Sequence, residues 1–433
     1  MTIETKLPFD QEYVSSYSKE AGEPSWLLDL RLHALAKAEE LPLPRPDKTN
    51  ITKWNFTSFS SHTANTAAVQ SIDELPEEVK ALINKDEVKN LYVQRDQTAA
   101  YAVLADELKE QGVIFTDILT AVKEHGELLQ KYFMKDGVKV DEHRLSALHA
   151  AYMNGGVFVY VPKNVEVKEP LQAIFTYEDS DTALFNHVIV VADDNSSVTY
   201  VENYVSTTEK GTVNIITEVF ANTNAKVTFG AVDYLGKDTT TYVNRRGVAG
   251  RDGRIEWALG LMNEGNTVSE NITYLMGDGS YGDTKTVTVG RGEQSQNFTT
   301  SVVHYGKHSE GYILKHGVVK DSASSIFNGI GKIEHGASKS NAEQESRVLI
   351  LSGKARGDAN PILLIDEDDV TAGHAASVGR VDPTQLYYLM SRGIPQTEAE
   401  RLVIHGFLAP VVNELPIETV KKQLTEVIER KVR

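Results

Sequence analysis

Three short segments of the chain repeat one pattern at nearly constant spacing. They read Asn195-Ser196-Ser197-Val198-Thr199-Tyr200, Asn224-Ala225-Lys226-Val227-Thr228-Phe229 and Asp252-Gly253-Arg254-Ile255-Glu256-Trp257, so the offsets are 29 and 28 residues. In each segment a small polar turn precedes a β-branched residue, a polar residue and an aromatic residue. Turn–strand units at a fixed period, with no helix between them, are typical of a solenoid. The segments therefore predict a parallel β-helix. A β-sandwich is the alternative, because repeats this degenerate also fit the spacing of ordinary hairpins.

The sequence around these segments has the composition of a continuous sheet. Short runs rich in Val, Ile, Thr, Tyr and Phe follow one another, and Gly, Asn, Asp and Ser separate them. Pro361 is the only proline between Leu171 and Val381, and a sheet tolerates few prolines because each one deletes a donor of the hydrogen-bond ladder. A shorter echo, in which 321–325 precedes 334–338, has about half the period. The expected fold class is therefore mainly β.

Helical sequence flanks this core on both sides and divides the chain into three regions. Residues 1–155 are expected to form a mainly helical N-terminal region that is α/β in character, with short strands near 90–94 and 99–103. Residues 156–381 are expected to form the β-helix core. Residues 382–433 are expected to form an all-α C-terminal region.

Local signals place the helix ends of the C-terminal region. Asp382 precedes Pro383 and can cap a helix, which we expect to end at Arg392-Gly393, because glycine commonly follows a helix C-terminus. Thr397 and Glu400 have the spacing of a capping box, in which each side chain accepts from a free backbone N–H of the first turn. A second helix should therefore start at Thr397.

Composition excludes several classes of function. The 433 residues carry a net charge of −17 and include no cysteine. Excess acid disfavours nucleic acid and anionic membranes as partners, since both attract clustered Lys and Arg. Without cysteine the chain alone can form no disulfide, thiol nucleophile or thiolate-held cluster. The first residues lack a basic start followed by an apolar core, and no run approaches the ~18 apolar residues of a membrane span. We therefore expect a cytoplasmic protein.

Common enzyme motifs are missing, and one histidine has an unusual setting. The sequence has no P-loop, HExxH, GxSxG or Rossmann pattern. The glycine-rich segment 277–283 and the four acids at 366–369 could each hold a hard cation, although a surface turn and a solvated loop are simpler interpretations. His374 lies between Gly373 and Ala375. Such small neighbours let another backbone or a metal cluster approach, although Gly-His-Ala also fits a tight turn.

Distinctive blocks of sequence occur near both ends of the chain and around His374. They are Gly22-Glu23-Pro24-Ser25-Trp26-Leu27, Leu41-Pro42-Leu43-Pro44, Phe327-Asn328-Gly329, Leu349-Ile350-Leu351-Ser352, Gly373-His374-Ala375-Ala376-Ser377-Val378-Gly379 and Tyr387-Tyr388-Leu389-Met390-Ser391-Arg392-Gly393-Ile394. In these blocks, over nearly its whole length, the chain resembles the SufB/SufD family of iron–sulfur cluster assembly proteins.

The resemblance implies a fold, a role and partners. The family fold is a right-handed parallel β-helix between helical terminal regions, and members are scaffold subunits of a complex that builds iron–sulfur clusters. By this resemblance the chain is not an enzyme. It would pair with a SufB-like scaffold through the β-helix and dock a SufC-like ATPase through its C-terminal helices, and an isolated chain could form a homodimer. No cofactor would be bound stably by the chain alone, whereas iron or a nascent cluster would bind transiently in the complex.

The resemblance also implies five candidate site residues. His374 matches the family's interface histidine, a candidate ligand of iron or of a cluster opposite a SufB cysteine. An imidazole can replace thiolate on iron, as in Rieske centres. Tyr387, Arg392, Gly393 and Phe407 are placed in or near the ATPase contact, although Tyr387 and Phe407 equally fit a helix core.

Two other classes of function stay open from the residues themselves. A carbohydrate lyase or hydrolase on a β-helix would use acidic residues in a groove, and it would usually carry a secretion signal. A solenoid that only self-associates would pair through an exposed edge. Within the family pattern, Ala372 stands where some relatives have cysteine, so a sulfur relay is not expected in this subunit.

Overall fold

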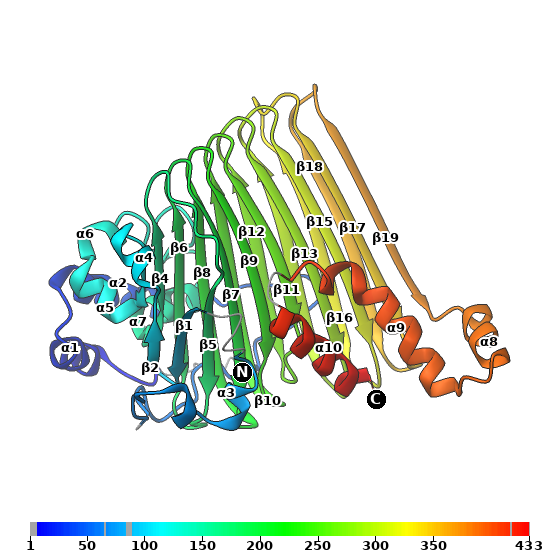
Figure 1. Ribbon diagram of the computed structural model, residues 1–433, viewed down its shortest axis with the longest axis horizontal. Coiled ribbons are helices and arrows are strands. Elements are labelled where there is room, and N and C mark those ends of the chain that lie inside the picture. Colours follow the sequence, from blue (N-terminus) through cyan, green and yellow to red (C-terminus); the bar gives the residue numbers. More distant parts are fainter. Residues whose placement is uncertain (1–6, 65, 84–88, 416–417, 433) are drawn as a thin grey trace.

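The chain folds around a parallel β-solenoid built from two facing sheets (Figure 1). The computed structural model describes residues 7–64, 66–83, 89–415 and 418–432. From β4 onward, each strand pairs in parallel with the strand two further along the chain. Consecutive strands therefore alternate between the sheets, and every coil of the solenoid adds one strand to each sheet.

The two sheets have ten and nine strands. Sheet 1 runs, in spatial order, β19 (Thr371–Arg380), β17 (Asn341–Ile350), β15 (Glu310–Val319), β13 (Tyr281–Gly290), β11 (Arg254–Leu261), β9 (Lys226–Tyr234), β7 (Ser197–Ser206), β5 (Leu171–Tyr177), β1 (Asn90–Arg95) and β2 (Thr98–Val103). Sheet 2 runs β18 (Arg356–Ile365), β16 (Ser324–Ile333), β14 (Ser295–His304), β12 (Thr267–Leu275), β10 (Asp238–Ala249), β8 (Lys210–Ala221), β6 (Leu184–Ala192), β4 (Gly155–Val161) and β3 (Ile114–Asp117). The β1–β2 and β3–β4 pairs are antiparallel.

The repeated segments stack on one another, as the sequence predicts. Tyr200 on β7 lies in register with Phe229 on β9, and Phe229 lies in register with Trp257 on β11. All three rings are buried inside the solenoid, with successive centroids 5.2 and 4.8 Å apart. Aromatic pairs at this separation contribute about 0.5–1.5 kcal/mol beyond area burial. The parallel β-helix is confirmed, and the β-sandwich alternative is wrong.

The turns before these strands explain why Asn and Asp recur at one position. Asn195, Asn224 and Asp252 have φ of +57°, +54° and +55°, a left-handed conformation that Asn and Asp tolerate better than most residues. The amide of Asn224 donates to Asn195 Oδ1 at 3.0 Å, and the amide of Asn195 donates to Asn164 Oδ1 at 3.1 Å. A side-chain ladder thus joins the turns of three successive coils.

The weaker sequence signals also have structural explanations. The turn at Asp321 joins β15 to β16, and the turn at 334–340 joins β16 to β17, so the echo at half the period marks opposite ends of one coil. Pro361 lies on β18, the edge strand of sheet 2. A proline on an edge strand removes the fewest hydrogen bonds from the sheet, because that strand has a neighbour on one side only.

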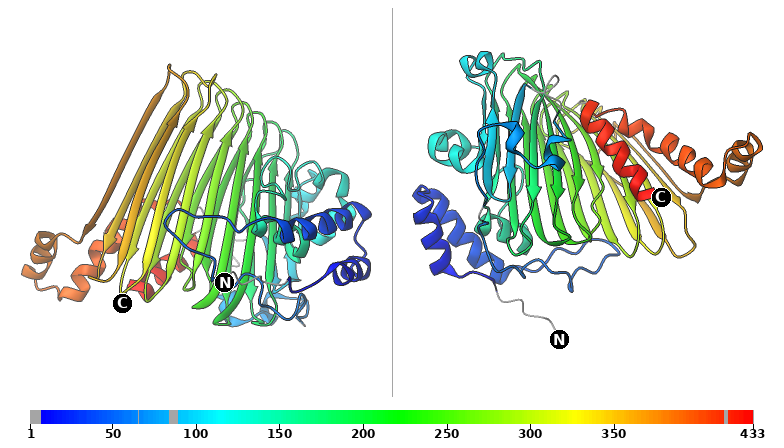
Figure 2. Two further views of the ribbon diagram at one scale, coloured as in Figure 1. Left: turned by 180° about the vertical axis from the view of Figure 1, so that it is seen from behind. Right: turned by 60° about the horizontal axis from the view of Figure 1, so that its bottom comes forward.

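Helices cover parts of the outer faces of both sheets (Figure 2). They are α1 (Gln11–Glu20), α2 (Ser25–Glu40), the 3₁₀ helix η1 (Ile72–Glu74), α3 (Glu77–Lys80), α4 (Asp106–Glu110), α5 (Ile118–Glu124), α6 (Gly126–Leu129), α7 (Arg144–Tyr152), α8 (Pro383–Ser391), α9 (Gln396–Val412) and α10 (Glu418–Val432). N-terminal helices pack with apolar side chains of β6 and β8 on sheet 2, whereas α9 and α10 pack across β9 to β15 on sheet 1. None of the described helices is both long and apolar enough to cross a membrane.

The N-terminal region contributes strands to both sheets of the solenoid. Strands β1, β2 and β3 all belong to its sheets. The extended segment around Asp47 and Lys48, which precedes these strands in the chain, crosses the outer face of sheet 2 (Figure 2, left). There the Asp47 carbonyl accepts from Asn297 Nδ2 at 2.7 Å, and Lys48 Nζ donates to Asn360 Oδ1 at 2.6 Å. The boundary near residue 155 therefore stays a prediction, because the sheets continue on both sides of it.

The capping box predicted in the C-terminal region is wrong. Helix α9 begins at Gln396, and Pro395 occupies the N-cap, with no side-chain cap. The carboxylate of Glu400 instead accepts from Gln396 Nε2 at 3.0 Å. Because the N-cap is Pro395, two residues before the predicted N-cap Thr397, Thr397 already lies inside the first turn.

An ion cluster is buried between the sheets. Arg245 on β10 donates to Glu202 Oε1 at 3.0 Å and to both oxygens of Asp233 at 2.9 and 3.0 Å, and all three side chains are fully buried. Burial raises the pKa of Glu202 to about 7, against the lowering effect of Arg245. The arginine thus compensates charges that the core could not otherwise hold.

Candidate partner-binding edge

The solenoid ends at strands β18 and β19, whose outer edges are uncovered (Figure 1). Each is the last strand of its sheet, so its outer backbone groups pair with no other strand of the described chain. Ile362 and Leu364 on β18 are 38% and 48% exposed, and Val378 on β19 is 44% exposed. A long edge strand with exposed apolar side chains is a template for strand addition by another chain.

His374 lies on β19, at the open edge of sheet 1. It is exposed and in register with Gln344 of β17. Gln344 faces the other sheet, because its Nε2 donates to the Ile362 carbonyl of β18 at 2.8 Å. Side chains in register in a parallel pair point to the same face, so His374 stands at the open mouth of the solenoid interior. A neutral imidazole there can bind a metal through a ring nitrogen.

Small residues around His374 leave the edge accessible. A Cβ added to Gly373 would meet nothing within 4 Å. An open hollow of about 610 Å³ extends from 371–375 across β17, β15 and β13 and is lined by Glu343 and Glu345 among others. In the part of the chain that the structure describes, no three His, Asp or Glu side chains are grouped to hold a metal ion. The edge therefore offers the His374 imidazole on its inner face, whereas Glu343 and Glu345, in register with Gly373 and Ala375, lie on the outer face of sheet 1.

Helix α8 projects from the far end of the C-terminal arm (Figure 1), and it contains no buried residue. Asp382 caps it, accepting from Thr384 N at 2.8 Å. Arg392 and Gly393 follow its end, and Gly393 has φ +85°, which confirms the predicted helix. Apart from its contact with α9, this short, capped helix without buried residues is available to a partner.

Among the described residues of this arm, Tyr387 is the most exposed large apolar one, at 74%. The guanidinium of Arg392 lies 5.3 Å from the centroid of the Tyr388 ring. Tyr387 lies on α8, Arg392 is its C-cap and Gly393 follows, so the three residues belong to one exposed helix and its C-terminal end. Our sequence prediction missed Tyr388 and Met390, which are 58% and 43% exposed on the same helix. Adjacent tyrosines on a helix of nine residues were the available signal.

Phe407 lies apart from these residues. It packs on sheet 1, where its ring stacks on His316 of β15 with centroids 4.7 Å apart. Nδ1 of His316 also donates to the Phe407 carbonyl at 2.7 Å. Burial is the main cause that lowers the pKa of His316, which favours the neutral ring in this contact. Phe407 therefore anchors α9 to the solenoid.

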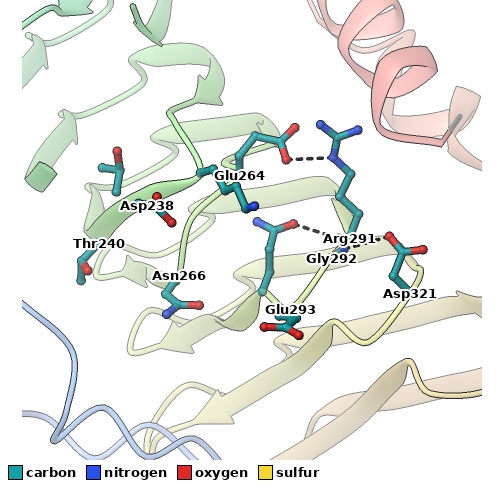
Figure 3. A pocket seen from close by; sticks show the side chains of 11 residues that line it. Asp238, Thr240, Glu264, Asn266, Arg291, Gly292, Glu293 and Asp321 are labelled. Atoms are coloured by element: carbon teal, nitrogen blue, oxygen red, sulfur yellow. Dashed lines mark hydrogen bonds and ion pairs between the residues drawn. The ribbon is translucent and has the colours of Figure 1, made fainter. Parts of the chain in front are cut away.

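A second cleft, of about 620 Å³, lies where turns of successive coils meet the end of α10 (Figure 3). Arg291 points toward Glu264 and donates Nε to its Oε2 at 2.9 Å, while Nη1 donates to the Arg430 carbonyl at 3.0 Å. Lys431 is buried and donates to the carbonyls of Met262 and Asn263 at 3.0 and 2.9 Å. Burial lowers the pKa of Lys431 to about 8. These hydrogen bonds of Arg291 and Lys431 thus hold the last turn of α10 against the solenoid.

Fold and site together define a β-solenoid protein with an open sheet end and an exposed helical arm. The family model "SUF system FeS cluster assembly, SufBD core domain" matches residues 175–407, and "SufBD protein N-terminal region" matches residues 47–173. The "Iron-sulfur cluster assembly protein SufD" of Bacillus subtilis (strain 168) is 70% identical over 437 aligned positions, which cover 100% of both chains. An "Iron-sulfur cluster assembly SufBD family protein" of Staphylococcus epidermidis (strain ATCC 12228) is 29% identical and covers 94% of this chain and 90% of its own.

This chain therefore belongs to the SufB/SufD family. It is a component of iron–sulfur cluster assembly in the Suf system. The matches favour that role over the carbohydrate lyase that the sequence left open.

Proposed function

We propose that this chain is a non-catalytic scaffold subunit of a cytoplasmic complex that assembles iron–sulfur clusters. In this role the solenoid end pairs with a SufB-like scaffold, and the C-terminal helices dock a SufC-like ATPase. Family membership and the 70% identical relative named SufD support the proposal. The single observation that carries it is the open end of both sheets, with His374 on the terminal strand.

Pairing at this end would satisfy the backbone groups that β18 and β19 leave free. A partner with its own β-solenoid can continue both sheets, because its terminal strands would have the same spacing of about 4.7–4.9 Å. Exposed Ile362, Leu364 and Val378 would then pass from water into the interface. Each apolar side chain that is fully buried in this way contributes about 1.5–3 kcal/mol.

His374 is proposed as a transient ligand of iron or of the nascent cluster at this interface. The cluster is the cargo of the complex, and the chain contains no cysteine, so thiolate ligands would come from the partner. Ala372 precedes His374 by two residues on the same face of β19. Because alanine cannot carry sulfur, persulfide chemistry is assigned to the partner as well.

The C-terminal arm is proposed as the ATPase contact. Tyr387, Arg392 and Gly393 would touch the ATPase directly, since they lie on the exposed helix α8 and its cap. Phe407 would support the contact without touching the ATPase, because it joins α9 to β15 through His316. Movement of α8 on ATP hydrolysis could then reach sheet 1 through α9.

Co-purification of the three proteins tests the proposal. The tagged full chain is co-expressed with the SufB-like and SufC-like proteins of the same organism, as wild type and as Ile362→Lys, which places a charge on the edge strand. Met276→Lys is the matched control, because Met276 is 50% exposed but lies beyond β12, away from the edge. We expect Ile362→Lys to lose the SufB-like protein and Met276→Lys to keep it. Equal recovery by both variants would contradict pairing at this edge.

A further inference from the structure

Three titratable side chains form a continuous hydrogen-bonded row beneath the N-terminal helices. His149 on α7, His187 on β6 and Glu218 on β8 are each 0% exposed. His149 Nε2 lies 3.0 Å from His187 Nδ1, and His187 Nε2 lies 3.0 Å from Glu218 Oε2. At the other end of the row, His149 Nδ1 lies 2.9 Å from Asn214 Oδ1. Three hydrogen bonds thus join four side chains.

Further hydrogen bonds fix both ends of this row. Asn214 presents its oxygen to His149, because its Nδ2 donates to the Leu145 carbonyl at 3.1 Å and the flipped amide would set two oxygens against each other. At the far end, the Glu218 oxygens accept from the backbone N–H groups of Met134 and Val138 at 2.9 and 3.0 Å. The row therefore runs between an amide oxygen and a carboxyl group.

Counting protons along the row gives its protonation state. Three hydrogen bonds need three protons, whereas two neutral imidazoles carry two in total. The third is either a carboxyl proton on Glu218 or an extra proton on one imidazole, and in both cases the cluster is neutral overall. With one proton fewer, two acceptors face each other and a negative charge is buried. With one proton more, two donors face each other.

We propose that His149, His187 and Glu218 form a buried proton-binding site that holds the N-terminal region on sheet 2, and that release of its third proton loosens this contact. The site joins α7 and the segment 134–138 to strands β6 and β8. Segment 134–138 follows Glu218 closely, because a Cβ added to Gly137 would lie 2.5 Å from Glu218 Oε1. The ring of Phe133 stacks on His187, with centroids 4.4 Å apart.

Burial locates the third proton on Glu218 at neutral pH. It raises the pKa of Glu218 to about 8 and lowers that of His187 to about 3. Burial also lowers the pKa of His149 well below its ordinary value. In this form Glu218 donates to His187 Nε2, His187 Nδ1 donates to His149 Nε2, and His149 Nδ1 donates to Asn214.

The charged groups that face the site from neighbouring elements leave this assignment unchanged. Arg246 on β10 lowers the pKa of Glu218, and Asp136 in the segment above raises it. Arg246 is itself paired with Glu142 at 3.1 Å and lies 3.7 Å from Glu270. Arg31 on α2 adds to the lowering of the pKa of His149.

The direction of the pH effect follows from these shifts. Because the pKa of Glu218 is raised in the folded chain, its contribution to stability is complete below about 4.5 and is lost as the pH rises toward about 8. Both imidazoles act in the opposite direction, since their contribution is lost as the pH falls below 6.5. Between pH 6.5 and 8, Glu218 is the one member of the row whose protonation state affects the stability of the contact. Loss of its proton lowers the equilibrium constant of the contact by up to about tenfold per pH unit.

Hydrogen exchange of the full-length chain tests the site. Protection of residues 134–149, corrected for the intrinsic pH dependence of exchange, is measured from pH 6.5 to 8.5 in wild type, Glu218→Gln and Glu310→Gln. In Glu218→Gln the amide NH₂ donates to His187 at every pH, while the Met134 N–H loses its acceptor, so each variant is compared with itself across pH. Glu310 is exposed on β15 and serves as the matched control.

We expect protection of 134–149 to fall with pH in wild type and Glu310→Gln and to stay constant in Glu218→Gln. The same decline in all three proteins would overturn the proposal. Should Glu218→Gln fail to fold, the ¹⁵N spectrum of histidine-labelled wild type decides. Signals of His149 and His187 that stay those of neutral imidazoles from pH 5.5 to 7.5 support the site. Titration of either ring near pH 6.5 contradicts it.

Discussion

The imidazole of His316 and the ring of Phe407 stack with centroids 4.7 Å apart, while His316 Nδ1 donates to the Phe407 carbonyl at 2.7 Å. This pair joins the C-terminal arm to the solenoid. Phe407 packs against the apolar cluster between the arm and sheet 1, which includes the buried Leu408 of α9 and Leu424 of α10. The arm is therefore firmly attached near Phe407 and exposed at α8.

Phe407→Ala and Tyr387→Ala are expected to separate attachment from partner contact. Phe407 is half-buried, so its removal should lower the free energy of unfolding by about 1–3 kcal/mol, less than the full cost of a buried Phe. Tyr387 is 74% exposed, and its removal should change stability by less than about 0.5 kcal/mol. Urea denaturation and pull-down of the SufC-like ATPase measure the two effects. Tyr387→Ala should bind the ATPase at least tenfold more weakly, and unchanged binding would remove Tyr387 from the contact.

The left-handed turn at Asn224 predicts an order among substitutions. Asn224→Ala should cost about 1–2 kcal/mol, because alanine is strained at φ +54° and the bond to Asn195 is lost. Asn224→Gly loses the same hydrogen bond but accepts the backbone conformation, so it should cost less than about 1 kcal/mol. Equilibrium unfolding in urea measures both. Alanine proving as stable as glycine would show that the turn relaxes.

The buried ion cluster predicts a large effect at Arg245. Arg245→Leu leaves Glu202 and Asp233 buried without a counter-charge and should cost about 3–5 kcal/mol at pH 7. The loss should shrink as the pH falls toward 5, because burial raises the pKa of Glu202 and its uncompensated carboxyl takes up a proton. Arg254→Leu is the control, since Arg254 is exposed and lies over the Tyr281 ring at 4.2 Å, and it should cost less than about 1 kcal/mol. Similar losses in both variants would contradict the compensation at Arg245.

Sequence alone predicted the solenoid because its period depends on local chemistry. Asn195, Asn224 and Asp252 occupy left-handed turns, and each is followed at a fixed distance by an aromatic residue of the inner ladder. The start of α9 was predicted wrongly, because Pro395 competes for the N-cap with the more familiar Thr397 signal.

Long-range features could not be predicted in this way. His149, His187 and Glu218 are separated by 38 and 31 residues and meet only after α7 packs on sheet 2. For the candidate site, His374 and α8 were located by resemblance to the family. That both lie on uncovered surfaces became visible only from the order of strands and the burial of side chains.

Cluster reconstitution on the assembled complex tests the central claim most directly. The complex with the SufB-like and SufC-like proteins is purified with wild type, His374→Ala and Ser377→Ala, the last altering another exposed residue of β19. Iron and sulfide bound per complex are then measured after anaerobic reconstitution. We predict that all three complexes assemble and that His374→Ala holds at least tenfold less cluster than the other two. Equal cluster content on an intact His374→Ala complex would contradict the role of this edge histidine.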